Sequence, residues 1–322
     1  MNNATKIWLI IGSVLIVTGI IIFSVAMTLN HWNFKTITNN KYVTTTHEVS
    51  EDFSNISLDT DTADVIFIPS DDKTCKVVCY ELTTAKHSVS VNNDSLTISL
   101  DDRRKWYDHI GLSWSTPTIT VYLPKADYNS LLVKSDTGKI EIPKDFKFEN
   151  ADIKATTGNV IYLASASGDI KIKTSTGNIR VENSFVNTMS LTTTTGRITV
   201  NSVECDNDIL LKVSTGNVKA NNISCNSLSS DGSTGYISLE NVIASDKIHI
   251  ERSTGNIDFE KCDAAEIYAK TTTGHIYGSL LSEKIFITES TTGNISVPKT
   301  TTGGKCELKT TTGNIKIKIN QN

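Results

Sequence analysis

The stretch "TSTGNIRV" (174–181) decides the fold because close copies of it recur along the chain. These copies are "VSTGNVKA" (213–220), "RSTGNIDF" (252–259), "STTGNISV" (290–297) and "TTTGNIKI" (310–317). Related corners place a glycine at intervals of 19 or 20 residues, at Gly138, Gly158, Gly177, Gly196, Gly216, Gly235, Gly255, Gly274, Gly293 and Gly313. A fixed period near 20 residues is typical of a solenoid, in which each coil stacks on its neighbour.

Apolar residues alternate with polar ones on both sides of each corner glycine. The residue two positions after the glycine is always Ile or Val, and the residue before it is always Thr. Spacing by twos indicates two short strands per repeat, each with one face inward. The sequence therefore predicts an all-β fold, a β-solenoid of ~20-residue coils over residues 131–322. With each coil placed over the preceding one at ~4.8 Å, the rod is about 43 Å long, and its Thr and Asn rows should form hydrogen-bond ladders.

The N-terminal segment "IWLIIGSVLIVTGIIIFSVAMTL" (7–29) contains no charged residue. As a helix it would be about 34 Å long, enough to cross a bilayer. We expect a short tail and transmembrane helix over residues 1–34, followed by a linker over 35–46. A cleaved signal peptide, with "SVA" (24–26) at the cleavage site, is the competing interpretation. The short tail favours an inside N-terminus, so we expect a single-pass protein of the cell membrane with its C-terminal domain extracytoplasmic.

Residues 47–130 show the pattern of β-strands without the strict repeat. The segment 57–69 resembles a first coil in which Ala63 replaces the corner glycine. A hairpin is expected at "NND" (92–94) between two alternating segments. We expect this section to open the solenoid and cap its N-terminal end, because an uncovered terminal coil would present an aggregating edge.

Composition excludes one class of partner. The chain has 31 basic and 35 acidic residues, so its net charge of −4 offers no electrostatic case for nucleic acid. Of its six cysteines, Cys205 and Cys225 lie one period apart and should stack, either as a buried thiol ladder or as a disulfide. Cys75 and Cys79 would share one strand face about 13 Å apart, too far to bridge.

The chain resembles a known bacterial family. The resemblance rests on the N-terminal span, "VIFIP" (65–69), "CKVVCYEL" (75–82), "SLTISL" (95–100), "TVYLP" (120–124), "SDTGKIEI" (135–142) and the serial "TTGNI" coils. These features are similar to the bacterial "putative adhesin" β-strand-repeat domain, a domain of unknown function in many Gram-positive membrane proteins, LiaG-like envelope-stress proteins included. The resemblance implies a membrane-anchored, extracytoplasmic, right-handed β-helix, and it brings no catalytic residues.

A search for chemistry finds no catalytic motif, no cofactor motif and no metal-ligand spacing. The histidines are scattered and are expected at the surface, and they are His31, His47, His87, His109, His249 and His275. One group of acidic residues should gather on the edge opposite the glycines, namely Asp206, Asp208, Asp246, Asp263, Glu266 and Glu283. Clustered carboxylates serve polysaccharide-cleaving β-helices, but solvated turns attract acidic residues for backbone reasons as well.

The candidate binding residues lie in "DDRRKWYDHIGLSWSTP" (101–117). Exposed aromatic residues beside arginines suit a sugar ring, a lipid headgroup or a protein partner. Alternatively, the aromatic side chains fold over the first coil as its hydrophobic cap. The residues are Arg103, Arg104, Trp106, Tyr107 and Trp114.

Three functional classes follow from the sequence. The first is a non-enzymatic, membrane-anchored cell-envelope protein whose solenoid binds a cell-wall glycan or an envelope protein. The second is an accessory component of an envelope-stress sensor or transport system. The third is a carbohydrate-active β-helix enzyme, which needs a catalytic cluster that the sequence does not show.

Overall fold

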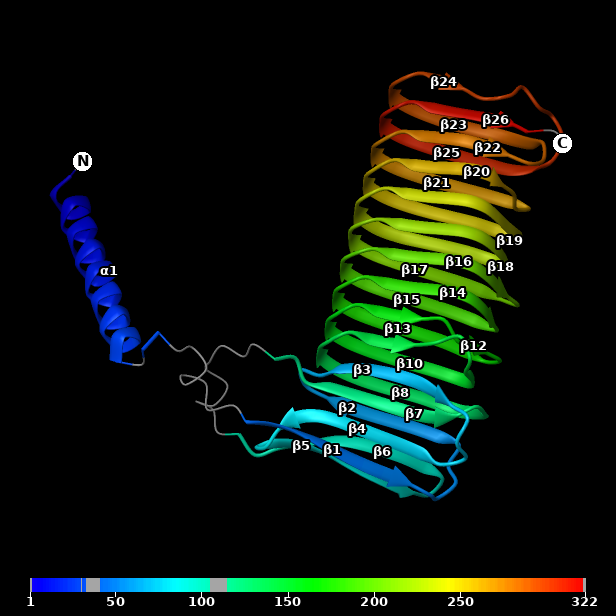
Figure 1. The fold of residues 1–322 in the computed structure, drawn as a ribbon. Coiled ribbons are helices and arrows are strands. Elements are labelled where there is room, and N and C mark those ends of the chain that lie inside the picture. The colour runs from blue at the N-terminus through cyan, green and yellow to red at the C-terminus, as the bar shows by residue number, and fades with distance from the viewer. Residues whose placement is uncertain (1, 30, 33–40, 105–114, 321–322) are drawn as a thin grey trace.

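The computed structural model describes residues 2–29, 31–32, 41–104 and 115–320. One helix, α1 (Asn3–Leu29), contains the apolar N-terminal segment, and 26 strands form one continuous sheet. Figure 1 shows these strands wound into a long stack of coils. The all-β solenoid predicted from the glycine period is confirmed.

The central coils consist of pairs of strands that meet at a corner glycine. They are β8 (Asp127–Thr137), β9 (Ile140–Ile142), β10 (Lys147–Thr157), β11 (Val160–Tyr162), β12 (Ser165–Ala166), β13 (Asp169–Thr176), β14 (Ile179–Val186), β15 (Thr188–Thr195), β16 (Ile198–Cys205), β17 (Asp208–Thr215), β18 (Val218–Thr234), β19 (Ile237–Thr254), β20 (Ile257–Cys262), β21 (Glu266–Thr273) and β22 (Ile276–Leu280). Every pairing between neighbouring coils in this part is parallel. The parallel ladder buries the Ile and Val rows that the sequence pattern placed inside.

The glycine corner demands a backbone that other residues adopt only under strain. Gly177 has φ 151°, and an added Cβ would lie 1.9 Å from the carbonyl oxygen of Gly158 in the adjacent coil. The repeat therefore keeps glycine for two reasons, the positive φ and the close approach of the next coil.

A second corner, six residues after the glycine, bends the later strand in five of the coils. Non-glycine residues there have φ between 50° and 53°, and they are Asn183, Ser202, Asn222, Asn241 and Lys261. Asparagine tolerates this left-handed conformation better than most residues. In β14 this corner shifts the alternation, so that Val181 and Ser184 both face inward while Phe185 faces outward.

The expected ladder along the asparagine row is confirmed and has a specific form. The backbone N–H of Asn178 donates to Oδ1 of Asn159 in the adjacent coil at 2.9 Å, and similar bonds recur along the stack. Inside the coil, Oγ1 of Thr193 donates to the carbonyl oxygen of Gly177 at 3.1 Å. Each threonine of this interior column thus satisfies a buried backbone carbonyl at the corner.

Four coils have neither threonine nor serine in this interior column, at Ala155, Val213, Gly232 and Arg252. Arg252 occupies the position of the threonines, is buried, and extends over Gly232, whose missing side chain leaves the room that its guanidinium fills. Nη1 donates to the carbonyl oxygen of Val213 at 3.3 Å and Nη2 to Oγ of Ser230 at 3.4 Å, while Nε has no partner among the residues that the structure describes. Burial lowers the pKa of Arg252 to about 10.

The N-terminal section contains β1 (Tyr42–Val49), β2 (Asn55–Thr60), β3 (Asp64–Ser70), β4 (Cys75–Leu82), β5 (Ala85–Asn92), β6 (Ser95–Asp102) and β7 (Thr118–Pro124). The first coil predicted at residues 57–69, with Ala63 in place of the corner glycine, is confirmed. The carbonyl oxygen of Ala63 lies 2.2 Å from a Cβ placed on Gly138, the same close approach that the corner glycines make to the adjacent coil. Its β2 and β3 pair with β8 and β9 on one side and with β6 and β7 on the other. The coil that is first in sequence is therefore second in space.

Antiparallel strands cover the N-terminal end of the stack. β4 pairs with β7, β5 pairs with β6, and β1 pairs with β4, all antiparallel. The expected hairpin joins β5 to β6, with Asn93 and Asp94 at positive φ. β1 begins at Tyr42, so strand structure extends into the segment expected as a linker (35–46).

The C-terminal coils do not stack in sequence order. β25 (Gly304–Thr312) and β26 (Ile315–Ile319) lie directly on β21 and β22, while β23 (Lys284–Thr292) and β24 (Ile295–Ser296) form the outermost layer (Figure 1). The expectation that each coil covers the preceding one is therefore wrong here. The outermost coil contains Pro298, which has no N–H for a further ladder, and it leaves Ile285 and Ile287 half-exposed. The coil that is last in sequence lies between two others, and its inward residues Cys306 and Leu308 are fully buried.

All six cysteines are buried free thiols. Cys205 and Cys225 follow the register pair Glu204 and Ser224 on neighbouring coils, and Sγ of Cys205 lies 3.3 Å from the carbonyl oxygen of Asn187. Of the two alternatives for this pair, the structure has the thiol ladder.

Candidate functional site

One outward-facing column of side chains runs along the short side of the coils after the second corner. Register pairs place Phe185 beside Glu204, Glu204 beside Ser224, and Ser224 beside Ile243. Phe185 is 62% exposed and Ile243 is 38% exposed. Large exposed apolar side chains on a soluble surface often mark binding sites when they lie in a hollow.

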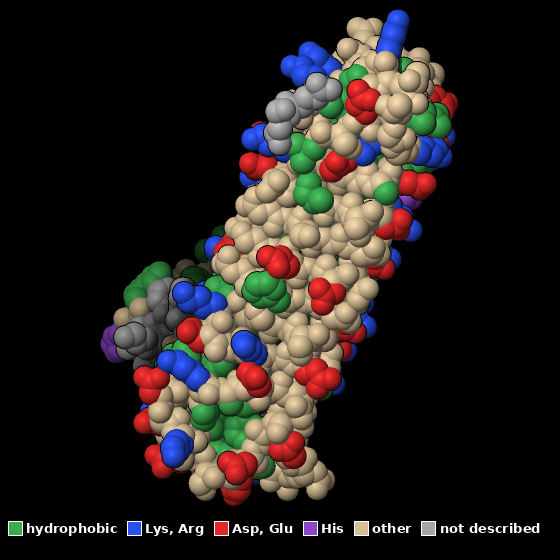
Figure 2. Space-filling model, turned by 90° about the vertical axis from the view of Figure 1, so that its right-hand side faces the viewer, with side chains coloured by type: hydrophobic (Ala, Val, Ile, Leu, Met, Phe, Trp, Pro, Cys, Tyr) green, Lys and Arg blue, Asp and Glu red, His purple; other side chains and the backbone are tan. Residues whose placement is uncertain are grey.

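Two hollows meet at Phe185. The larger, about 690 Å³, lies over the N-terminal coils and is lined by Asp127, Tyr128, Asn129, Lys147, Phe148, Glu149, Ser165, Ala166, Ser167 and Phe185. The other, about 450 Å³, follows the second corner and is lined by Asn183, Ser184, Phe185, Ser202, Val203, Glu204, Asn222, Ile223, Ser224, Asn241 and Ile243. We call the two hollows together the Phe185 groove. Figure 2 shows one side of the stack, on which charged side chains are scattered and hydrophobic side chains gather over the lower coils.

The Phe185 groove combines a largely apolar lining, with one exposed aromatic ring at Phe185, and polar groups along its border. Amide and hydroxyl groups border it, and Nδ2 of Asn241 donates to Oδ1 of Asn222 at 2.9 Å. Glu204 contributes a carboxylate next to the phenyl ring. An exposed ring surrounded by such donors and acceptors is able to stack on a ligand while neighbouring groups hydrogen-bond to it.

The candidate residues of segment 101–117 lie partly outside the described residues, namely Trp106, Tyr107 and Trp114. Arg103 is exposed and pairs with Asp101 at 2.7 Å. Arg104 is only 10% exposed in its side chain, and its guanidinium pairs with Asp102 at 2.6 Å and Asp61 at 2.9 Å. These pairs link the end of β6 to the first corner of the β2–β3 coil. The choice between a cap and a contact surface for the aromatic residues stays a prediction.

The acidic residues expected on one edge do lie along the turns there, and several of them bond to other side chains. Asp208 accepts from Asn226 at 3.3 Å, and Asp246 accepts from Ser227 at 3.3 Å. Asp263 pairs with Lys284 at 2.6 Å. Within the described parts of the chain, no three of these carboxylates come close enough to share a cation. The arrangement supports the solvated-turn interpretation.

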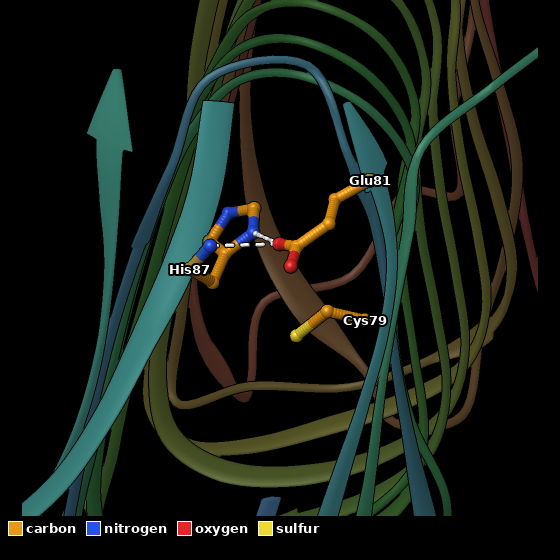
Figure 3. Close-up of side chains that lie close together, drawn as sticks. All are labelled: Cys79, Glu81 and His87. Atoms are coloured by element: carbon orange, nitrogen blue, oxygen red, sulfur yellow. Dashed lines mark hydrogen bonds and ion pairs between the residues drawn. The ribbon is translucent and has the colours of Figure 1, made fainter. Parts of the chain in front are cut away.

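A buried cluster that the sequence reasoning missed lies in the N-terminal covering layer. Cys79 and Glu81 of β4 and His87 of β5 face the same interior space, and each is at most 5% exposed. Figure 3 shows Glu81 and His87 pointing toward one another from facing strands, with Sγ of Cys79 turned toward the same space. Nδ1 of His87 lies 2.8 Å from Oε2 of Glu81, and the His87 N–H donates to the same oxygen at 2.7 Å.

The expectation that the histidines lie at the surface is wrong at His87. It follows Ala85 and precedes Val89 on the inward face of an alternating strand, so period two alone would have placed it inside. Glu81 likewise continues the inward row of Cys79 on β4. Burial, and secondly the carboxylate of Glu81, raise the pKa of Cys79 to about 12, so this thiol is no nucleophile at neutral pH.

The stacked coils with their glycine corners define a repeat β-solenoid protein with one N-terminal helix long and apolar enough to span a membrane. The chain belongs to the Toastrack DUF4097 family, whose model matches residues 53–210 and 206–322. The sequence-based resemblance to an unknown-function repeat domain is thereby confirmed.

A comparison with solved structures finds several that are similar to this chain. One is a putative adhesin from Bacteroides fragilis, 17% identical, with a TM-score of 0.42 over 87% of this chain and 99% of that chain. Another is a putative adhesin from Parabacteroides merdae, 12% identical, with a TM-score of 0.48 over 76% and 98%. A third is described as a putative lipid binding protein from Parabacteroides distasonis, 17% identical, with a TM-score of 0.46 over 74% and 95%. Among curated proteins, none matches this chain.

Proposed function

We propose that this protein is a noncatalytic, membrane-anchored component of the cell envelope whose extracytoplasmic solenoid binds a cell-wall glycan in the Phe185 groove. The observation that carries the proposal is the exposed ring of Phe185 between two hollows bordered by amide and hydroxyl groups. Sugar rings present apolar faces to an aromatic ring and hydroxyl groups to neighbouring donors and acceptors, which this arrangement matches.

The shape of the groove favours an elongated ligand. Three coil intervals separate Phe185 from Ile243, about 14 Å at the ladder spacing of parallel strands. The second corner repeats on each of these coils, so the same polar groups recur along the groove. A polymer with a repeating unit fits such a surface, and the carboxylate of Glu204 disfavours a strongly anionic one.

The noncatalytic part of the proposal rests on the chemistry of the described residues. The acidic side chains at the turns are bonded to Asn, Ser and Lys groups rather than paired across a substrate-sized gap. The thiol of Cys79 is buried with a raised pKa. These acidic side chains and this thiol therefore support a protein that binds its ligand without cleaving it.

The membrane part rests on α1. This helix spans 27 residues with a mean hydropathy of 2.7. A helix of this length is about 40 Å long and covers the hydrocarbon thickness of a bilayer with some tilt. The short N-terminal tail lies inside the cell, and the solenoid extends from the outer surface.

The test is cosedimentation of the full-length protein, in detergent, with insoluble cell-wall polysaccharide. Replacement of Phe185 by Ala should weaken binding about tenfold, the equivalent of ~1.4 kcal/mol, without changing the melting temperature. Tyr236→Ala is the matched control, an exposed aromatic residue at a glycine corner outside the groove. Equal binding by wild type and Phe185→Ala would contradict the glycan proposal. Loss of a copurifying membrane protein in the Phe185 variant, with glycan binding unchanged, would favour the accessory role instead.

A further inference from the structure

The cluster of Cys79, Glu81 and His87 arises from the way the N-terminal layer folds. Cys79 and Glu81 are two residues apart on β4 and therefore share its inward face. The chain reverses between Leu82 and Ala85, and β5 returns along the facing side with His87 inward. One candidate ligand atom from each side chain lies within 4.8 Å of the other two.

Hydrogen bonding within the described chain leaves this cluster incomplete. Oε2 of Glu81 receives both the backbone N–H and the ring nitrogen of His87, but Oε1 is buried and has no partner. The described contacts give Sγ of Cys79 no hydrogen bond either. A buried carboxylate oxygen without a partner costs free energy unless a further group satisfies it.

The geometry points to a binding site for a divalent transition-metal ion of the zinc type, with Sγ of Cys79, a carboxylate oxygen of Glu81 and Nδ1 of His87 as ligands. Thiolate, imidazole and carboxylate are the donors that Zn²⁺ and Co²⁺ take in proteins. Mg²⁺ and Ca²⁺ are the wrong class, because they require six or more oxygen ligands.

Distances and charge both fit this ion. Ligand atoms at 2.0–2.3 Å from a tetrahedral centre lie about 3.3–3.8 Å from one another. The distance of 2.8 Å between Nδ1 of His87 and Oε2 of Glu81 has to increase by roughly half an ångström. Sγ of Cys79, now within 4.8 Å of the other two ligand atoms, has to lie about 3.3–3.8 Å from each of them. One thiolate and one carboxylate neutralise the two positive charges, so the occupied site carries no net charge in an apolar interior. The thiol proton is released to solvent on binding, and His87 binds as the tautomer that carries its ring proton on Nε2, which then donates to Oγ1 of Thr60.

Groups around the cluster supply the remaining requirements of a metal site. Nε2 of His87 lies 2.9 Å from Oγ1 of Thr60 on β2, a partner that holds the ring with Nδ1 toward the cluster. A cavity of about 20 Å³ borders Glu81, His87 and Arg104, and this volume holds one water molecule as a fourth ligand. The ion would join β4 and β5 directly, and β2 through Thr60, at the end of the stack that follows the membrane helix.

Cobalt titration of the full-length protein, stripped with a chelator and held in detergent, tests the site. We expect a near-ultraviolet thiolate-to-cobalt band that saturates at one ion per chain, disappears on addition of zinc, and accompanies a rise in melting temperature. Cys79→Ser should abolish the band. Cys75→Ser is the matched control, because Cys75 is a buried cysteine on the same face of β4, four residues away, and the band should remain.

Wild-type protein that gives no thiolate band with cobalt overturns the proposal, whatever the variants do. A band that persists in Cys79→Ser, or one that Cys75→Ser removes, overturns it as well. Should Cys79→Ser fail to fold, His87→Gln provides the second variant. It should retain the thiolate band with at least tenfold weaker cobalt binding, and unchanged affinity would remove His87 from the ligand set.

Discussion

The order of the last coils gives the sharpest test of the structure, because two stacking orders predict opposite crosslinks. In the structure Lys270 of β21 is the register partner of Lys309 of β25, and Lys309 is the partner of Glu289 of β23. Stacking in sequence order would instead place Lys270 beside Glu289. All three side chains face outward, away from the buried row.

Paired cysteine substitutions convert this difference into a covalent result. Neighbouring coils lie ~4.8 Å apart and alternate coils ~9.6 Å, while a disulfide needs Cα atoms within about 7 Å. Lys270→Cys with Lys309→Cys should therefore crosslink, and Lys270→Cys with Glu289→Cys should not. Glu289→Cys with Lys309→Cys serves as the control, because both orders make these residues neighbours.

The assay is mild oxidation of the full-length protein in detergent, followed by mass spectrometry of unreduced peptides. The 270–309 bridge closes a loop of about 40 residues, which corresponds to up to about 4 kcal/mol of added stability in the chain-entropy model. Its unfolding transition should move to higher temperature and return on reduction. A 270–289 crosslink without a 270–309 crosslink would refute the intercalated order of the C-terminal coils.

Four further outcomes follow from the same structure. Gly216→Val should destabilise the protein by about 1–3 kcal/mol or more, because Gly216 has φ 140° and an added Cβ would lie 1.7 Å from the carbonyl oxygen of Gly196. In the same chemical denaturation experiment, Ser214→Val on the exposed face should change the free energy of unfolding little. Gly232→Thr should destabilise the protein because an added Cβ lies 1.7 Å from Nη1 of Arg252 and 1.9 Å from the carbonyl oxygen of Val213, and adding Arg252→Thr should remove only the first clash, so that the double variant recovers part of the lost stability in a double-mutant cycle. Thiol reagent under non-reducing conditions should label six cysteines after denaturation and almost none before it; fewer than six would indicate a disulfide. Protease added to intact protoplasts should remove the solenoid, and full protection would contradict its extracytoplasmic placement.

Several features of the fold were predictable because local sequence encodes them directly. The positive φ at each corner requires glycine, so the period of the glycines gave the period of the coils. Alternation by twos gave the buried rows, and it identified the first coil although Ala63 replaces its glycine. The hairpin at Asn93 and Asp94 and the apolar N-terminal helix were likewise readable from short segments.

The groove and the buried cluster needed contacts between segments far apart in sequence. The second corner had a weak signal, since Asn or Ser stands six residues after four of the ten corner glycines, but the Phe185 groove appears only when neighbouring coils align. His87 faces Glu81 because β5 returns along the other side of the interior, and Thr60 reaches it from a different coil.

Coil sequence by itself determined what each layer looks like, and tertiary structure alone decided which layer lies on which. Every coil presents nearly the same corner and the same apolar row, so any coil is able to stack on any other with similar hydrogen bonds. The choice at the C-terminal end depends on whole-coil packing. The segment with Cys306 and Leu308 buries its row completely between two neighbours, whereas the outermost segment leaves Phe286 of its inward row only partly buried. This difference in burial depends on the contacts between stacked coils, so the sequence of a single repeat does not reveal it.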